Sequence, residues 1–110
     1  MSARRRVLVL GASGMIGRAI QDEARGAEAV ELLPASHRER PGHVLVDFEA
    51  LTTADSWART LRDQRIDAVV NCVGIWSGTV GQFELVQYTV PVALFDACTR
   101  MDLRVVHLSA

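Results

Sequence analysis

Lysine is absent from this sequence, so all twelve of its basic residues are arginine. Cysteine and tyrosine are scarce as well, with two cysteines, Cys72 and Cys98, and one tyrosine, Tyr88. Two cysteines are too few for a disulfide scaffold, and we expect both to stay reduced in a cytoplasmic protein. No apolar run approaches the ~20 residues that a membrane-spanning helix requires. The net charge of −1 argues against any general affinity for nucleic acid.

Metal-ligand spacing is also missing. The histidines, His37, His43 and His107, have no cluster of further ligands beside them, so we expect no metal site. What the chain does have is 110 residues, 49% of them hydrophobic, which suits one compact domain. Residues 4–6 and 7–10 resemble the start of a signal peptide, but glycines soon interrupt the apolar run. We therefore interpret them as an exposed lead-in and a first buried strand.

Strand-like apolar runs alternate with helix-like segments along the chain. Strands are expected at residues 7–10, 30–33, 44–47, 68–72 and 105–108, and helices at 15–25, 52–65 and 83–100. This alternation predicts an α/β fold with a Rossmann-type, doubly wound parallel sheet. Right-handed crossovers give the strand order 3-2-1-4-5, with the chain stopping after the fifth strand.

Local features refine this outline. Pro34 is expected to end the second strand, and Thr53 to cap the second helix. Pro91 removes a hydrogen bond to the carbonyl of Gln87, so we expect the last helix to kink or restart there. The apolar stripe of the first helix is expected to lie in the core, and its residues are Met15, Ile16, Ala19, Ile20 and Ala24.

A glycine-rich turn joins the first strand to the first helix. In the pattern G-x-x-G-x-x-G, Gly11 permits the tight turn, Gly14 lets backbone amides approach a pyrophosphate, and Gly17 lets the helix pack closely on the strand. The start of the helix adds free N–H groups and a positive dipole end. We expect this dinucleotide site to use Gly11, Ser13, Gly14, Met15, Ile16 and Gly17. The alternative is a tight turn that binds nothing.

The end of the second strand carries information about the cofactor. Proteins that bind NAD usually place an acidic residue here for the ribose 2′-hydroxyl. This chain has Ser36 and Arg38 instead, a hydroxyl and a cation that suit the 2′-phosphate of NADP. NADP is therefore the expected cofactor, with NAD as the alternative. The competing interpretation is that Arg38 is a solvated loop residue, because Glu39 and Arg40 follow it.

Residues 67–74 form a buried strand that ends in a glycine, Gly74, which leaves room for a flat ligand. We expect the side-chain amide of Asn71 to support the neighbouring strand. Cys72 is interpreted as a small buried hydrophobe rather than a nucleophile, because no histidine lies near it in the sequence. The glycine-rich segment 74–81 is either a mobile flap over the nicotinamide end or an ordinary connection.

These motifs together resemble the short-chain dehydrogenase/reductase superfamily. The chain is most similar to its extended and atypical NAD(P)-dependent epimerase/dehydratase-like branch, in the group that includes the NADPH-binding accessory subunit of respiratory complex I. The likeness rests on residues 11–17, 46–48, 67–74, 91–98 and 105–110. It implies that Asp47 contacts the adenine with Phe48 beside it. It also implies that the backbone around Cys72, Val73 and Gly74 lines the adenine ribose and the path toward the nicotinamide.

The chain departs from the family pattern in several places. The catalytic Tyr-x-x-x-Lys is absent, since Tyr88 is the only tyrosine and no lysine exists. Gln87 stands where many relatives have asparagine. Ser109 falls where the family places a catalytic serine or threonine, although a shift of one residue would bring Ala110 there. The alternative for Ser109 is a strand-end serine that bonds nearby backbone.

The resemblance also implies that the fold continues beyond these residues. We therefore interpret residues 1–110 as the N-terminal portion of a longer protein, or as a truncated gene product, without the substrate-binding part. Three hypotheses follow: an NADP-binding domain of an oxidoreductase or epimerase-like enzyme, a non-catalytic NADPH-binding structural or sensor protein, or a nonfunctional fragment. The expected partners are the dinucleotide and an unidentified small substrate. We also expect self-association through the exposed edge strand at 105–108.

Overall fold

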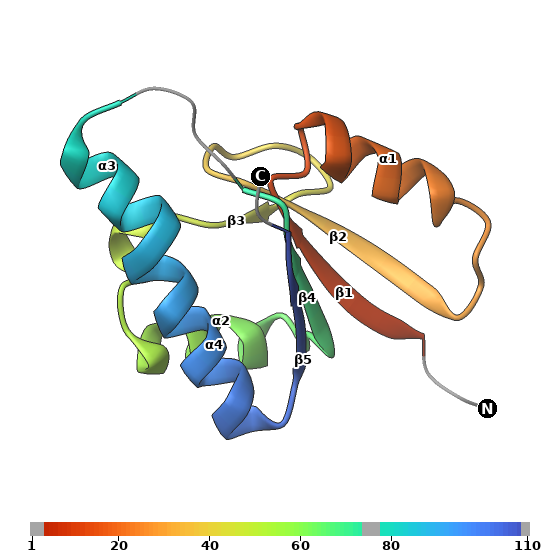
Figure 1. Cartoon of the computed structure of the whole chain (residues 1–110). Helices are drawn as coiled ribbons and strands as arrows, with labels where there is room; N and C mark the ends of the chain where they lie inside the picture. Colours follow the sequence, from red (N-terminus) through yellow and green to blue (C-terminus); the bar gives the residue numbers. More distant parts are fainter. Residues whose placement is uncertain (1–3, 74–77, 109–110) are drawn as a thin grey trace.

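The computed structural model describes residues 4–73 and 78–108 of the chain. Within them, five parallel strands form one sheet in the order β3-β2-β1-β4-β5, which confirms the predicted order (Figure 1). The strands are β1 (Arg5–Leu10), β2 (Val30–Ser36), β3 (Val44–Leu45), β4 (Ala68–Asn71) and β5 (Arg104–His107). Because β3 and β5 are the edges of this described sheet, self-association through residues 105–108 stays a prediction.

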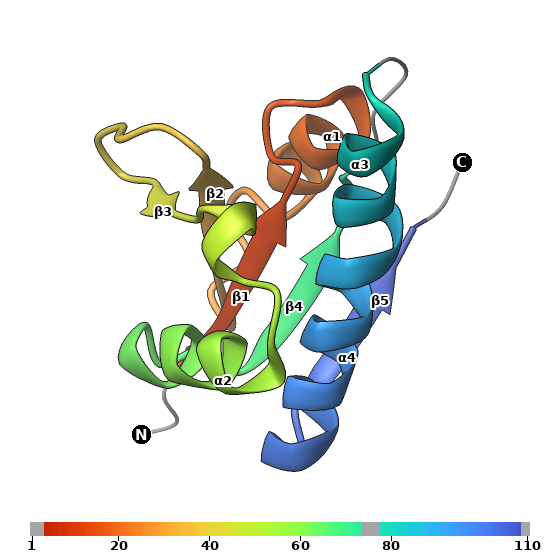
Figure 2. The ribbon, with the colours of Figure 1, turned by 90° about the vertical axis from the view of Figure 1, so that its left-hand side faces the viewer.

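Helices cover both faces of the sheet, as the doubly wound topology requires. Helix α1 (Met15–Glu23) lies on one face, and α2 (Ala54–Asp63) and α4 (Val90–Met101) lie on the other (Figure 2). A short 3₁₀ helix, η1 (Phe48–Ala50), follows β3. Helix α3 (Val80–Glu84) continues through a π-helical turn, η2 (Leu85–Thr89), into α4. No helix in the described part of the chain is long and apolar enough to cross a membrane.

The hydrophobic core lies between the sheet and the α2–α4 pair. Trp57 and Leu61 of α2 and Leu94 of α4 are fully buried against Leu8 and Val69 of the central strands. The predicted cap at Thr53 is confirmed, because its Oγ1 accepts a 3.2 Å hydrogen bond from the Ser56 backbone N–H. The side chains of α2 and α4 also meet at the surface.

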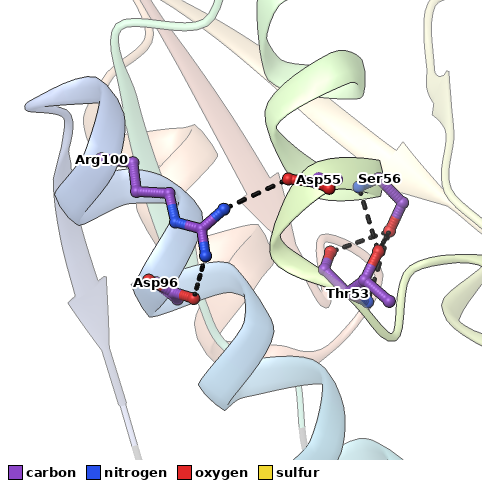
Figure 3. A network of polar contacts seen from close by, with 5 residues as sticks. All are labelled: Thr53, Asp55, Ser56, Asp96 and Arg100. Carbon is purple, nitrogen blue, oxygen red and sulfur yellow. Dashed lines mark hydrogen bonds and ion pairs between the residues drawn. The ribbon is translucent and has the colours of Figure 1, made fainter.

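An arginine joins these two helices at the surface, beside the α2 cap (Figure 3). One guanidinium nitrogen of Arg100 lies 3.1 Å from Asp55 of α2, and the other lies 3.1 Å from Asp96 of α4. All three side chains are more than half exposed, so the pairs contribute little energy and mainly fix the orientation of the side chains.

Pro34 does not end the second strand, contrary to expectation. It lies inside β2, opposite Val9 of β1, and the strand runs on to Ser36. Strand β3 pairs only with Ala35 and Ser36, so at Pro34 one side of β2 has no neighbouring strand. A residue without an N–H is tolerated at such an unpaired position, and the strand continues past it.

The last predicted helix changes its geometry around Pro91, as expected. The regular α-helix restarts at Val90, and Pro91 occupies its first turn, where a missing N–H costs little. The preceding turn is π-helical from Leu85 to Thr89. A π-helical turn shifts the hydrogen-bond pattern by one residue, which accommodates the proline without ending the helix.

The apolar stripe of α1 does not lie in the core, so that prediction is wrong. Met15 is 85% exposed and Ile16 is 53% exposed, and Gly17 is the only buried residue of the helix. The helix packs against the turn after β1 through close backbone contact at Gly17, while Met15 and Ile16 are exposed. Nothing in the described ranges packs over them.

Two glycines bring backbone segments into unusually close contact. A Cβ atom added at Gly17 would lie 2.3 Å from the carbonyl oxygen of Gly11 and 2.8 Å from the Cα of Ala12. A Cβ atom added at Gly11 would lie 2.8 Å from the carbonyl carbon of Cys72, and Gly11 also has a φ of +74°. The turn after β1 is therefore fitted between α1 and the end of β4, with no room for a side chain at either position.

We expect Gly17→Ala to destabilise the protein by roughly 1–3 kcal/mol, because the methyl group overlaps backbone atoms that cannot move aside. Gly81→Ala in α3 is the matched control. Its Cβ would meet only Thr79 Oγ1 at 3.9 Å, so the gain in helix propensity should leave stability unchanged or raise it by up to about 1 kcal/mol. Urea unfolding followed by circular dichroism measures both variants. Equal effects of the two substitutions would contradict this account of the turn.

Burial raises the pKa of the Cys98 thiol from 9.0 to about 11. Between about pH 9 and about pH 11 the folded protein therefore keeps this proton, whereas the unfolded chain loses it. The free energy of unfolding must then fall as the pH rises through this range. We expect Cys98 to account for about 2 kcal/mol of that fall. The unfolding free energy of wild type and Cys98→Ala at both pH values measures this part. The prediction fails if the unfolding free energies of wild type and Cys98→Ala fall by the same amount between the two pH values.

Candidate functional site

A cavity of about 750 Å³ opens at the carboxyl ends of the strands. Four segments line it: the end of β1 with the turn that follows, the region from the end of β2 to η1, Val73 after β4, and α3 with η2. The chain runs outward in opposite directions from β1 and β4, and this reversal is where open α/β sheets bind ligands. The volume falls in the range of sites for small molecules and cofactors, roughly 300–1,000 Å³.

The glycine turn presents unshared backbone N–H groups toward this end of the sheet. Gly14 is the N-cap of α1, and no side chain caps the helix there. The Gly14 N–H donates to the Gly11 carbonyl at 3.1 Å, which closes the turn. The Gln21 side chain donates to the Ala12 carbonyl at 2.9 Å and Arg18 donates to the Ser13 carbonyl at 2.8 Å. A rigid turn with an uncapped helix start is suited to bind phosphate groups.

The predicted residues of this turn do not all reach the cavity. Gly11 and Ser13 line it. Gly17 is buried behind the turn, where it permits the close packing described above. Met15 and Ile16 belong instead to a shallow apolar depression along α1, away from the cavity. Gly14 is not among the lining residues; it is the N-cap residue of α1.

The cavity wall after β2 is rich in cationic groups. Ser36 and Arg38, predicted from the sequence, line the cavity, and the Ser36 hydroxyl accepts a 3.2 Å hydrogen bond from the Arg38 backbone N–H. Arg40 and His43 line it as well, and sequence reasoning had not assigned them to the site. The buried Nδ1 of His43 makes no hydrogen bond within the described part of the chain. Arg40 and His43 lie in a turn region, where the sequence has no periodic pattern that could have assigned them to the site.

The acidic part of the wall comes from the segment after β3. Asp47 and Phe48 both line the cavity, as does Glu49. One carboxylate oxygen of Asp47 accepts a 3.1 Å hydrogen bond from the Glu49 backbone N–H and so caps η1. The Phe48 ring packs on Trp57 with centroids 6.4 Å apart, which anchors this wall to the core.

The end of β4 contributes to the site mainly through its backbone. Val73 lines the cavity, whereas Asn71 and Cys72 lie behind it. The Asn71 side chain contacts His107 of β5 at 3.1 Å, which confirms the expected support of the neighbouring strand. Burial raises the pKa of the Cys72 thiol, so the thiol stays protonated at neutral pH and is a poor nucleophile. Gly74 and Ser109 lie outside the described residues.

The start of α3 forms a wall that the sequence analysis missed. Gln82, Leu85 and Val86 line the cavity from α3 and η2. A capping box places this helix, since Thr79 Oγ1 accepts from the Gln82 N–H at 3.1 Å and Gln82 Oε1 accepts from the Thr79 N–H at 2.8 Å. The pattern Thr-x-x-Gln was visible in the sequence and could have marked a helix start at residue 80.

The structure also bears on metal binding. Across residues 4–73 and 78–108, no group of three or more His, Cys, Asp or Glu side chains is arranged to hold a metal ion. The chemistry of the described site is that of backbone amides, arginines, histidines and the two carboxylates of Asp47 and Glu49.

Comparisons with known proteins identify the same fold in several enzymes. Uronate dehydrogenase from Agrobacterium tumefaciens has a TM-score of 0.70 and 23% identity, over 99% of this chain and 42% of that one. A variant of that dehydrogenase is complexed with NAD. A dTDP-4-dehydrorhamnose reductase from Bacillus anthracis, in complex with NADP, has a TM-score of 0.72 and 14% identity, over 96% of this chain and 36% of that one. UDP-N-acetylglucosamine 4-epimerase from Bacillus cereus has a TM-score of 0.73 and 17% identity, over 96% of this chain and 40% of that one.

At these identities the likeness establishes the shared fold alone. The chain spans less than half the length of the structures it matches. No curated protein sequence matches it. The sequence pattern of one family, however, matches residues 7–110, which includes the glycine turn and the ends of β2 and β4. The chain belongs to the NAD dependent epimerase/dehydratase family.

Proposed function

We propose that this chain is the NADP-binding part of an oxidoreductase or epimerase-like enzyme. The observation that carries the proposal is one cavity that extends from an uncapped helix start to a wall containing two arginines. A dinucleotide needs both features, since its pyrophosphate binds to helix N–H groups and its adenosine end reaches the tip of the second strand. Family membership supports the same class of cofactor.

The residues present fit such a cofactor. A Cβ at Gly11 would lie within 2.9 Å of the Cys72 carbonyl and the Val73 nitrogen, so a glycine there lets the turn pack directly on the end of β4 beside the cavity. Ser13 lines the cavity beside this turn. Asp47 and Phe48 lie on the wall after β3, where the family resemblance places the adenine. When bound, the nicotinamide would supply a hydride acceptor or donor, and the residues described here would hold and orient the dinucleotide.

NADP is favoured over NAD by the charges at the end of β2. Arg38 and Arg40 line the cavity, and the Ser36 hydroxyl lies beside the Arg38 backbone. The first acidic side chain that follows, Glu39, is not part of the cavity wall. A 2′-phosphate would thus meet guanidinium groups at a position where many NAD-binding proteins place a repelling carboxylate.

The second candidate is a non-catalytic protein that uses NADPH structurally or as a sensor. These 110 residues contain no Tyr-x-x-x-Lys pair, so they are compatible with this role as well as with the first. The sequence downstream of Ala110 distinguishes the two candidates. A Tyr-x-x-x-Lys motif there supports the enzyme, and its absence supports the structural or sensor role. A third possibility, a nonfunctional fragment, is tested by thermal melting with and without NADPH.

We expect the chain to bind NADPH about 10- to 100-fold more tightly than NADH, because a charge-assisted hydrogen bond contributes roughly 1.5–3 kcal/mol. Arg38→Ala should remove most of this preference by weakening NADPH binding alone. Arg59→Ala is the matched control, since Arg59 is an exposed arginine of α2 and is not part of the cavity wall. Titration calorimetry with both dinucleotides measures the effect. Equal affinities of wild type for NADPH and NADH would contradict the proposed preference.

We expect residues 1–110 alone to show no measurable hydride transfer. An unperturbed tyrosine has a pKa near ~10 and is a poor base at neutral pH without a nearby cation, and this chain has no lysine to supply one. NADPH fluorescence with a panel of aldehydes and ketones provides the measurement. Turnover that disappears in Ser109→Ala would show that Ser109 supports chemistry without the missing pair, and would overturn this expectation.

A further inference from the structure

We propose that His107 is a positioning residue of the cofactor site. Through the side chain of Asn71, it fixes the peptide between Cys72 and Val73, on which the glycine turn rests. His107 lies on β5, two strands away from that turn, and does not line the cavity. The readouts that use a dinucleotide rest on the proposed function, but the contact itself can be tested without one.

The first link is the close contact between β4 and the glycine turn. A Cβ at Gly11 would lie 2.9 Å from the Val73 nitrogen, so the turn has backbone against it on this side. The Cys72 N–H also donates to the Leu10 carbonyl at 2.9 Å, which binds the end of β4 to β1. Any shift of the Cys72–Val73 peptide must therefore move Gly11 or collide with it.

The second link is Asn71, the buried polar residue at the end of β4. It is 2% exposed, and both ends of its amide have partners. Its Oδ1 accepts a 3.1 Å hydrogen bond from the Val73 N–H. Its Nδ2 lies 3.1 Å from Nδ1 of His107, the residue paired with it in the β4–β5 register. The orientation of one side-chain amide thus connects His107 to the peptide beneath the turn.

The third link is the protonation state that this geometry requires. A backbone N–H only donates, so Val73 must face the oxygen of the Asn71 amide, and the amide nitrogen must face His107. Nδ1 of His107 must then accept, which requires a neutral ring with its proton on Nε2. A protonated ring would set two donors against each other. Turning the amide over would only move that conflict to Val73.

The surroundings of His107 add no charge that would override this requirement. Asn71 faces it from β4, and the Phe95 ring packs on it from α4 in a T-shaped arrangement with centroids 5.5 Å apart. Within the described ranges, no ion pair or hydrogen bond joins His107 to a charged side chain. The contact with Asn71 therefore determines which ring nitrogen of His107 carries the proton in this geometry.

The first experiment uses the full chain, labelled with ¹⁵N, without any dinucleotide. The imidazole spectrum of the wild type should show an unprotonated Nδ1 at neutral pH. In His107→Leu, the backbone amide signals of Val73 and Gly11 should shift, whereas Val106→Ala on the same strand should leave them in place. A proton on Nδ1 in the wild type would overturn the proposal, as would unchanged Val73 and Gly11 signals in His107→Leu. The wild-type spectrum tests the protonation of His107 Nδ1 even if a variant fails to fold.

The second experiment measures NADPH affinity at one neutral pH. We expect His107→Leu to bind about 3- to 10-fold more weakly than wild type, which corresponds to the loss of one hydrogen bond. His107→Gln offers an amide oxygen to Asn71 and should recover most of that affinity. If Gln binds as weakly as Leu, the role of His107 as an acceptor is wrong. If the wild type binds neither NADPH nor NADH, the proposed function fails. The spectra of the first experiment still test whether His107 and Asn71 fix the Cys72–Val73 peptide.

Discussion

Three backbone segments pack closely together at the first turn: the turn itself, the start of α1 and the end of β4. This packing determines how the candidate site is built. A Cβ atom at Gly17 would overlap the carbonyl oxygen of Gly11, and a Cβ atom at Gly11 would overlap the backbone at the end of β4. Since neither position tolerates a side chain, helix and strand converge on one point at the carboxyl ends of the sheet. The uncapped start of α1, the cavity and the peptide at Cys72–Val73 are all positioned by this convergence.

Charge is distributed unevenly along the cavity that results. The end nearest β2 carries Arg38 and Arg40, while Asp47 and Glu49 lie on the wall after β3. The turn after β1, on the other side of β2 from β3, contributes backbone groups and Ser13. In the proposed function, these chemically different walls would meet different parts of a dinucleotide: amides the pyrophosphate, guanidinium groups a 2′-phosphate, and a carboxylate with an aromatic ring the base.

The sequence predicted the topology and the centre of the site, because both depend on local pattern. Alternating apolar runs and right-handed crossovers are enough to order the strands, and the glycine spacing is enough to locate the turn. Pro34 misled because its effect depends on whether a neighbouring strand needs its N–H. The stripe of α1 misled because helical periodicity shows that a face is apolar, without showing that anything covers it. Gln82, Leu85 and Arg40 were missed because only the tertiary fold brings them to the cavity.

The exposed side of α1 has a consequence for local motion. A helix whose only buried residue is a glycine gains little from the hydrophobic effect, so backbone contact and a few hydrogen bonds hold it in place. Its amides should exchange with solvent through local opening at a lower free energy than those of β1 or α4. A ligand held at the start of α1 would oppose that opening. Occupancy of a site there would then be reported most sensitively by hydrogen exchange in this helix, rather than by the melting of the whole domain.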